Sequence, residues 1–360
     1  MFKSFHNTHS ISFAPKYIPV INSLRGLAAV LVCFFHLICL PLGFLENTVI
    51  YQLAPYGRFG VQIFFVITGI VIPIALINAN YTYTLFSRFM LKRILRIEPP
   101  YLFAIITAII FTVFRNQFLS KVQHNLPSIE SLLLHIGYLV PFVNGEKWFI
   151  IVFWTMAVEF QFYILVSLLL PLLLNKNPTT RLACYGLTFA LALTFKNTAF
   201  ALVWLPVFML GIVYTSFLFC KIKLPEFLTL LIILAGFNFY LHGFVITLVA
   251  VFTLAAIHFF YNYKSKIGNF FGRISYSLYL VHTIVGTATV NFFVPYTSQV
   301  HLKLLVILLS FVISIIAAYV FYWLIESPFQ KYASKISLHH KPFDTKDSSM
   351  PSAEKYKLNY

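Results

Sequence analysis

The chain has 360 residues, of which 60% are apolar and only 10% are charged, and its formal net charge is +16. Soluble domains carry about 25% charged residues, so this composition excludes a soluble globular enzyme and indicates a protein that crosses a membrane several times. Such positive charge is typical of loops that face anionic lipid, and it gives no reason to expect a nucleic-acid partner.

Apolar segments of spanning length follow one another along the chain and predict an all-α polytopic membrane protein with about ten transmembrane helices. The expected spans are residues 19–42, 59–77, 99–116, 148–174, 182–196, 200–220, 225–241, 243–262, 273–295 and 302–325. A further apolar segment at 128–143 is short and ends near Pro141, so we expect it to be re-entrant or to lie in the membrane interface.

A single domain is expected to fill the chain, because the sequence has no repeat of fixed period and no linker between two apolar blocks. The transmembrane domain is predicted at 18–328, after a cytoplasmic N-terminal tail at 1–17. Residues 329–360 are rich in Lys and Ser and predict a flexible cytoplasmic C-terminal tail.

The Lys and Arg residues are distributed unevenly between the two sides of the expected bundle. If both termini are cytoplasmic, most of the 26 Lys and Arg residues fall in the tails and in the loops on the same side. The positive-inside rule therefore predicts that the N-terminus and the C-terminus are both cytoplasmic.

The first expected span contains two ionisable residues, Arg25 and His36, in the stretch RGLAAVLVCFFH. Eleven residues separate them, so on a helix they lie about 20° apart around the axis and about 16 Å apart along it. Ionisable groups inside a span are costly to insert, by about 2.5–3.5 kcal/mol for an Arg at the centre, and by default they indicate a functional site.

Five stretches carry polar residues within or beside the apolar segments. They are INSLRGLAAVLVCFFHL, GRFGVQIFFVITGIVIP, FMLKRILRIEPPYL, WTMAVEFQFYILVSLLLPLLL and GRISYSLYLVHTIV, and IESPF follows near the end. In this order, from about residue 18 to 332, they resemble the membrane-bound acyltransferase-3 family, whose members include enzymes that O-acetylate bacterial surface polysaccharides. The glycines of the second stretch, Gly57, Gly60 and Gly69, are expected to permit close approach between helices.

The chain departs from the family pattern at several positions. Asn22-Ser23 stands where Asp-Gly is usual, Thr68 and Thr155 where Ser is usual, Phe160 where a second Glu is common, and Glu98 where a Tyr is common. Some family members carry an extra hydrolase-like domain, and we expect none here because the chain ends too soon for one.

The resemblance implies an O-acyltransferase of the inner (plasma) membrane. Its cosubstrate would be acetyl-coenzyme A from the cytoplasm, and its acceptor would be a hydroxyl of an exopolysaccharide, a lipopolysaccharide or a lipid-linked glycan. No metal is expected, since the four cysteines lie in apolar segments without the spacing of metal ligands.

His36 is the expected general base, because a neutral imidazole can take the proton of a sugar hydroxyl near working pH. An acyl-histidine intermediate and a purely structural histidine are the alternatives. Arg25 is expected to bind a phosphate or to orient the donor, with a role as a topology anchor as the alternative.

Arg93 and Arg96 are three residues apart, on one helical face, in the loop expected before the Pro99-Pro100 step. Bidentate arginines suit the phosphates of acetyl-coenzyme A, and positive-inside charge alone is the competing explanation. Neighbouring Arg88 and Lys92 are interpreted as lipid-facing charge.

Glu159 lies in the middle of a span with Tyr163 one turn later, and either a catalytic role or neutralisation of an arginine fits a carboxylate there. Tyr163, Ser275, Tyr276, Tyr279 and His282 are expected along the substrate path. A Ser–His nucleophile pair of Ser275 with His282 is disfavoured, because no acidic residue follows at suitable spacing. Near the end of the chain, Glu326 is expected to pair with a basic loop.

Two other functions remain open from the sequence. A proton-coupled transporter of lipid-linked glycans would also use intramembrane Arg, His and Glu, although the chain lacks two related halves with matching broken helices. A weaker alternative is that the transferred group is succinyl or another short acyl chain in place of acetyl.

Overall fold

The protein is described by a computed structural model that covers residue 15 and residues 17–41, 43–118 and 125–338. Within these residues the chain is helical and contains no strand. The helices are α1 (Val20–Cys39), α2 (Val49–Leu53), α3 (Gly60–Asn78), α4 (Phe86–Phe118), α5 (Ile129–Ile136), α6 (Trp154–Leu173), α7 (Pro178–Thr194), α8 (Ala201–Leu218), α9 (Leu224–Phe259), α10 (Lys266–Val281), α11 (Thr287–Phe293), α12 (Val300–Phe321) and α13 (Ser327–Ser334). Most of the tails predicted at 1–17 and 329–360 lies outside the described residues.

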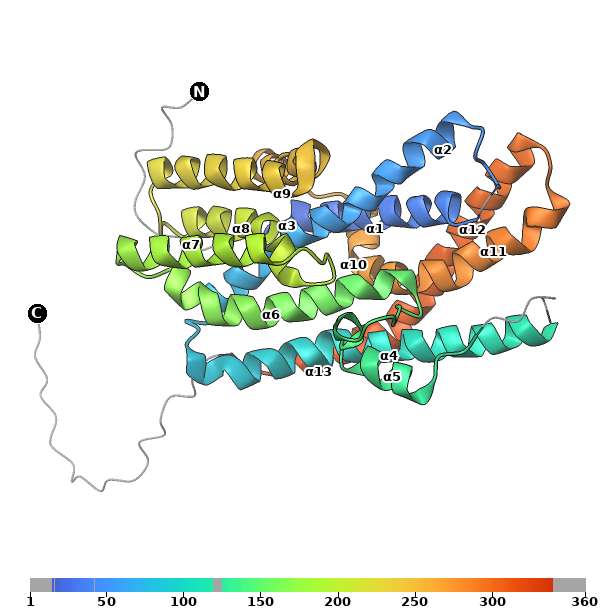
Figure 1. Ribbon diagram of the computed structural model, residues 1–360, viewed down its shortest axis with the longest axis horizontal. Coiled ribbons are helices and arrows are strands. Elements are labelled where there is room, and N and C mark those ends of the chain that lie inside the picture. Colours follow the sequence, from blue (N-terminus) through green and yellow to red (C-terminus); the bar gives the residue numbers. More distant parts are fainter. Residues whose placement is uncertain (1–14, 16, 42, 119–124, 339–360) are drawn as a thin grey trace, which may run out of the picture.

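The described part of the chain has eight helical segments that are long and apolar enough to cross a membrane. The expected all-α polytopic fold is therefore confirmed, and in Figure 1 the long helices α1, α4, α6 and α7 run along the same axis. The remaining two expected spans correspond to α7, which has 17 residues, and to the second half of α9. Helix α9 is interrupted at Gly243 (φ 79°, ψ −179°), between the spans expected at 225–241 and 243–262.

Helix α4 differs from the sequence-based expectation. Residues 78–98 were predicted as a loop, but α4 begins at Phe86 and continues through Pro99 and Pro100. A proline removes a backbone hydrogen bond from a helix, and in a helix bundle a neighbouring side chain can replace it. Close to the two prolines, the Tyr276 hydroxyl donates to the Ile97 carbonyl at 2.7 Å and ties α10 to this part of α4. Arg93 and Arg96 therefore stand on a continuous helix.

Two charged residues of α4 were interpreted as facing lipid. The half-buried Lys92 also has a partner within the protein, since its Nζ donates to the Ile336 carbonyl, just after α13, at 3.1 Å. The contact joins the beginning of α4 to the end of the described chain.

Close contacts between helices depend on glycine. A Cβ atom added at Gly57 or Gly60 would lie 2.4 or 2.5 Å from a carbonyl oxygen of α1, and one at Gly69 would lie 2.2 Å from the Phe208 carbonyl of α8. At Gly272 of α10 it would lie 2.2 Å from the Asn22 carbonyl of α1. The expectation for the three glycines of the second stretch is confirmed, and α1 is held against α10 in the same manner.

The segment expected to be re-entrant or interfacial, 128–143, contains only the eight-residue helix α5 and a short turn. It is anchored by His135, whose Nε2 accepts a hydrogen bond from the Phe149 amide at 2.8 Å. Tyr101 of α4 donates to the His135 carbonyl at 3.1 Å. The segment is thus a short element packed against α4 that does not span.

Candidate active site

A cavity of about 100 Å³, here called the arginine cavity, collects most of the residues that the sequence singles out. Its polar lining comes from α1, α3, α4, α6, α10 and the turn before α13. These polar residues are Arg25, Thr68, Arg93, Arg96, Thr155, Glu159, Tyr163, Ser275, Tyr276, Tyr279 and Glu326. Of the predicted site residues, His36 and His282 alone are not on its wall.

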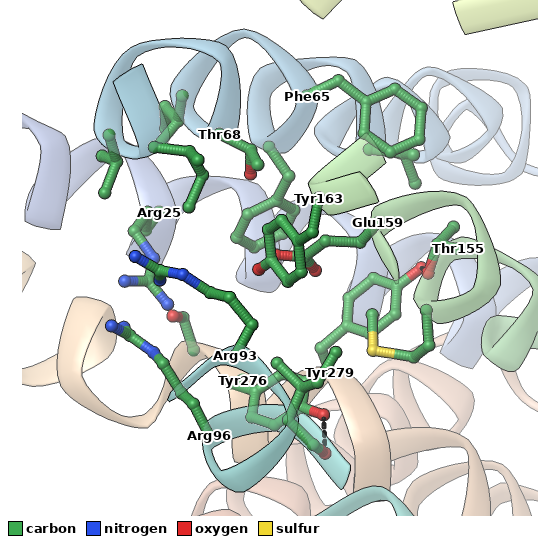
Figure 2. Close-up of a pocket in the computed structure, with 18 of the residues that line it drawn as sticks. Arg25, Phe65, Thr68, Arg93, Arg96, Thr155, Glu159, Tyr163, Tyr276 and Tyr279 are labelled. Carbon is green, nitrogen blue, oxygen red and sulfur yellow. Dashed lines mark hydrogen bonds between the residues drawn. The ribbon is translucent and has the colours of Figure 1, made fainter. Parts of the chain in front are cut away.

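The three arginines gather at one side of the arginine cavity, and Thr155 and Tyr279 lie at the other (Figure 2). No carboxylate forms an ion pair with them, since the only salt bridge among the described residues joins Arg181 to Glu226. A group of neighbouring cations without direct counter-ions attracts an anion.

Arg93 is the most deeply buried of the three, with 5% of its surface exposed. Its guanidinium lies over the rings of Phe89 and Tyr163, 5.4 and 5.6 Å from their centres. Its Nε has no hydrogen-bond partner among the residues that the structure describes. A buried donor without a partner is costly, so this side chain is arranged for a ligand that accepts a hydrogen bond.

The two carboxylates of the arginine cavity are held by hydroxyl and amide groups. Glu159 accepts a hydrogen bond from Tyr163, one turn along α6. Glu326 accepts from the Ser277 amide at 3.1 Å, from the Ser277 hydroxyl at 2.5 Å and from the Gln330 amide nitrogen at 2.6 Å. The expected pairing of Glu326 with a basic loop is therefore wrong. This residue lines the cavity, which the sequence analysis missed although IESPF belonged to the pattern.

The hydroxyl groups of α10 on the cavity wall are occupied. Ser275 donates to the Gly272 carbonyl of its own helix at 2.9 Å, and Tyr279 shares a hydrogen bond of 2.8 Å with Thr155 of α6. Ser275 does not contact His282, in agreement with the low expectation for a Ser–His nucleophile. The contact between Tyr279 and Thr155 joins α10 to α6 at the cavity wall.

His36 and His282, here called the histidine pair, contact each other beside the arginine cavity. The Nδ1 atom of His36 lies 2.9 Å from Nε2 of His282, and both rings are buried. His282 begins a π-helical turn, His282–Gly286, that joins α10 to α11. Tyr279 links the histidine pair to the cavity, since its ring centre is 6.0 Å from that of His282.

The hydrogen bonds assign the protons of the neutral histidine pair. The Nδ1 atom of His282 lies 2.8 Å from the Leu278 carbonyl, which only accepts, so this nitrogen carries the proton. Its Nε2 must then accept from the Nδ1–H of His36. The lone pair of His36 is consequently on Nε2, the form that a general base requires.

Comparisons with known proteins give a consistent picture. The family model described as "Acyltransferase domain" matches residues 18–323. The O-acetyltransferases OatA of Staphylococcus aureus strains NCTC 8325 / PS 47, COL and MRSA252 are each 27% identical to this chain over 171 residues, which is 46% of this chain and 26% of each relative. The match thus spans about a quarter of the length of these relatives. No solved structure matches significantly.

Proposed function

This chain belongs to the acyltransferase family whose model covers residues 18–323, and we propose that it is a membrane O-acetyltransferase that modifies a glycan. The acyl donor would be acetyl-coenzyme A, and the acceptor a hydroxyl of a cell-surface or exported glycan. The O-acetyl transfer for which the OatA relatives are named supports the reaction type.

The observation that carries the proposal is the convergence of Arg25, Arg93 and Arg96 on one cavity without an ion pair. Coenzyme A bears several phosphates, and planar guanidinium groups bind phosphate through two parallel hydrogen bonds. The positive-inside rule predicts that both termini are cytoplasmic in a protein of the plasma membrane. In that orientation the three arginines come from the cytoplasmic halves of α1 and α4.

His36 is proposed as the general base. Its Nε2 takes the proton of the acceptor hydroxyl while the oxygen attacks the thioester carbonyl carbon and forms the new C–O bond. The tetrahedral intermediate then collapses, the C–S bond breaks, and the sulfur leaves as the free thiol with the proton that the imidazolium returns. The products are the glycan ester and coenzyme A, and no other reactant is needed.

His282 is proposed to position His36, because its Nε2 holds the Nδ1–H of the base in place and stabilises the imidazolium that forms. Glu159 and Tyr163 are hydrogen-bonded to each other on the wall of the arginine cavity. They are proposed to position the acetyl group of the donor. Ser275, Tyr276 and Tyr279 complete that wall along the path of the substrate.

The experiment uses purified protein in lipid nanodiscs with acetyl-coenzyme A labelled in its acetyl group. The acceptor is the surface polysaccharide of the source cells after mild alkali has removed its esters. We expect alkali-labile label on the polysaccharide and one equivalent of free thiol for each acetyl group transferred. Unlabelled polysaccharide would contradict the proposal, and proton-driven uptake of glycan into vesicles would replace it with transport.

A further inference from the structure

A second cavity of about 330 Å³ lies outside the site described above. Its polar wall includes Thr112 and Arg115 of α4, Thr283 of the π-helical turn and Thr287 of α11. We call it the threonine cavity. None of the described residues that line it is acidic.

Three of the helical segments that line the arginine cavity continue to the threonine cavity. Helix α1 contributes Arg25 to the arginine cavity, and Leu40, directly after α1, lines the threonine cavity. Helix α4 lines the first with its N-terminal half and the second with its C-terminal half, and Tyr279 and Thr283 repeat this order along α10 and the π-helical turn. His36 lies between Arg25 and Leu40 along the first of these segments, and His282 lies between Tyr279 and Thr283 along the third. The histidine pair therefore separates the two cavities.

Two polar atoms at the threonine cavity have no hydrogen-bond partner in the part of the chain that the structure describes. They are Oγ1 of Thr283, a residue with 9% of its surface exposed, and Nε of Arg115. Thr283 directly follows His282 in the chain. Buried hydrogen-bonding groups are nearly always satisfied, so two unsatisfied ones on one cavity wall point to a ligand that satisfies them.

The lining has the chemistry of a sugar site. Threonine hydroxyls donate and accept, the guanidinium donates in a planar fork, and Phe111 and Phe149 add an apolar wall. We propose that the threonine cavity binds the sugar ring that accepts the acyl group, with Arg115 and Thr283 as its hydrogen-bonding contacts. This inference rests on the proposed function, because it divides that reaction between a donor cavity and an acceptor cavity on either side of the histidine pair.

The test measures KM for both substrates in nanodiscs, with acetyl-coenzyme A and the alkali-treated surface polysaccharide. Thr283→Val keeps the shape of the side chain and removes its hydroxyl. Arg115→Gln removes the guanidinium group and its charge. We expect each to raise KM for the polysaccharide fivefold or more and to leave KM for acetyl-coenzyme A within twofold. Arg93→Ala should instead raise KM for acetyl-coenzyme A and leave KM for the polysaccharide within twofold.

The matched controls are Thr289→Val on α11 and Arg58→Gln, which line neither cavity. Both should behave as the parent chain does. An increase in KM for the polysaccharide no larger than that of the controls, or an increase in KM for acetyl-coenzyme A instead, would overturn the acceptor site.

A second measurement separates failure of this inference from failure of the proposed reaction. Thr287→Cys is labelled with a maleimide that does not cross membranes, and labelling above that of the parent chain is followed with and without the polysaccharide. Protection by the polysaccharide supports the site even if no acetyl group is transferred. Equal labelling rates with and without the polysaccharide would refute it.

Discussion

The Nδ1 atom of His36 lies 2.9 Å from the Nε2 atom of His282, although 246 residues separate them in the chain. Helix α1 can approach α10 this closely because Gly26 and Gly272 leave room for the backbones. The contact gives the proposed base a fixed tautomer, which a histidine surrounded by aliphatic side chains would lack.

Replacing His282 tests whether it acts through His36. We expect His282→Leu to lower kcat by about tenfold or more, since the Nδ1–H of His36 would lose its acceptor. His282→Gln supplies an amide oxygen as a new acceptor and should recover part of the loss, with KM for both substrates unchanged. A purely structural role predicts no difference between the two variants when equal amounts of folded protein are compared.

His36→Ala removes the proposed base itself. We expect a folded, membrane-inserted protein whose kcat for acetyl transfer falls by about 10²-fold or more, the usual contribution of a general base. His301→Ala, at an exposed position at the start of α12, is the control and should keep parental activity. Near-parental transfer by His36→Ala would remove the assignment.

Arg93→Ala tests binding of the donor phosphates. The variant should raise KM for acetyl-coenzyme A about tenfold, with little change in kcat, because a contact to a non-reacting phosphate is the same in the ground state and the transition state. Arg273→Ala removes an exposed arginine of α10 and should change neither constant. A fall in kcat at unchanged KM would place Arg93 at the reacting group and not at the phosphates.

Gly272→Ala tests the contact between α1 and α10. The added methyl group would lie 2.2 Å from the Asn22 carbonyl, and overpacking of this kind costs about 1–3 kcal/mol. We expect a lower thermal unfolding midpoint in detergent and weaker transfer, because the histidine pair depends on this contact. Gly236→Ala, where a Cβ meets nothing within 4 Å, should unfold at or above the parental midpoint.

The sequence predicts much of this site because its signals are local. Arg25 was noticed because an arginine inside a span is costly, and Arg93 and Glu159 followed from the family resemblance. All three line one cavity. The break at Gly243 also falls between two spans that hydropathy alone separates.

Features that depend on packing were not predictable in this way. Helix α4 continues through Pro99 and Pro100, where local rules predict an end, and its Ile97 carbonyl accepts a hydrogen bond from Tyr276, 179 residues away in sequence. The contact of His36 with His282 depends on the rotation of α10 about its axis. Thr283 and Arg115 carry no sequence signal of a site, because only the packing of the helices creates the cavity that they line. Contacts between distant helices leave no local periodicity to detect.

The widened turn at His282–Gly286 holds one residue more than an α-helical turn would. Deleting a residue from it would restore regular winding and leave the later side chains, Thr287 among them, near their present register. Deleting a residue from a regular turn of α10 would instead rotate every later side chain by about 100° and shift it by about 1.5 Å. A single deletion at Val285 should therefore be far better tolerated than one inside α10, which would turn His282 away from His36.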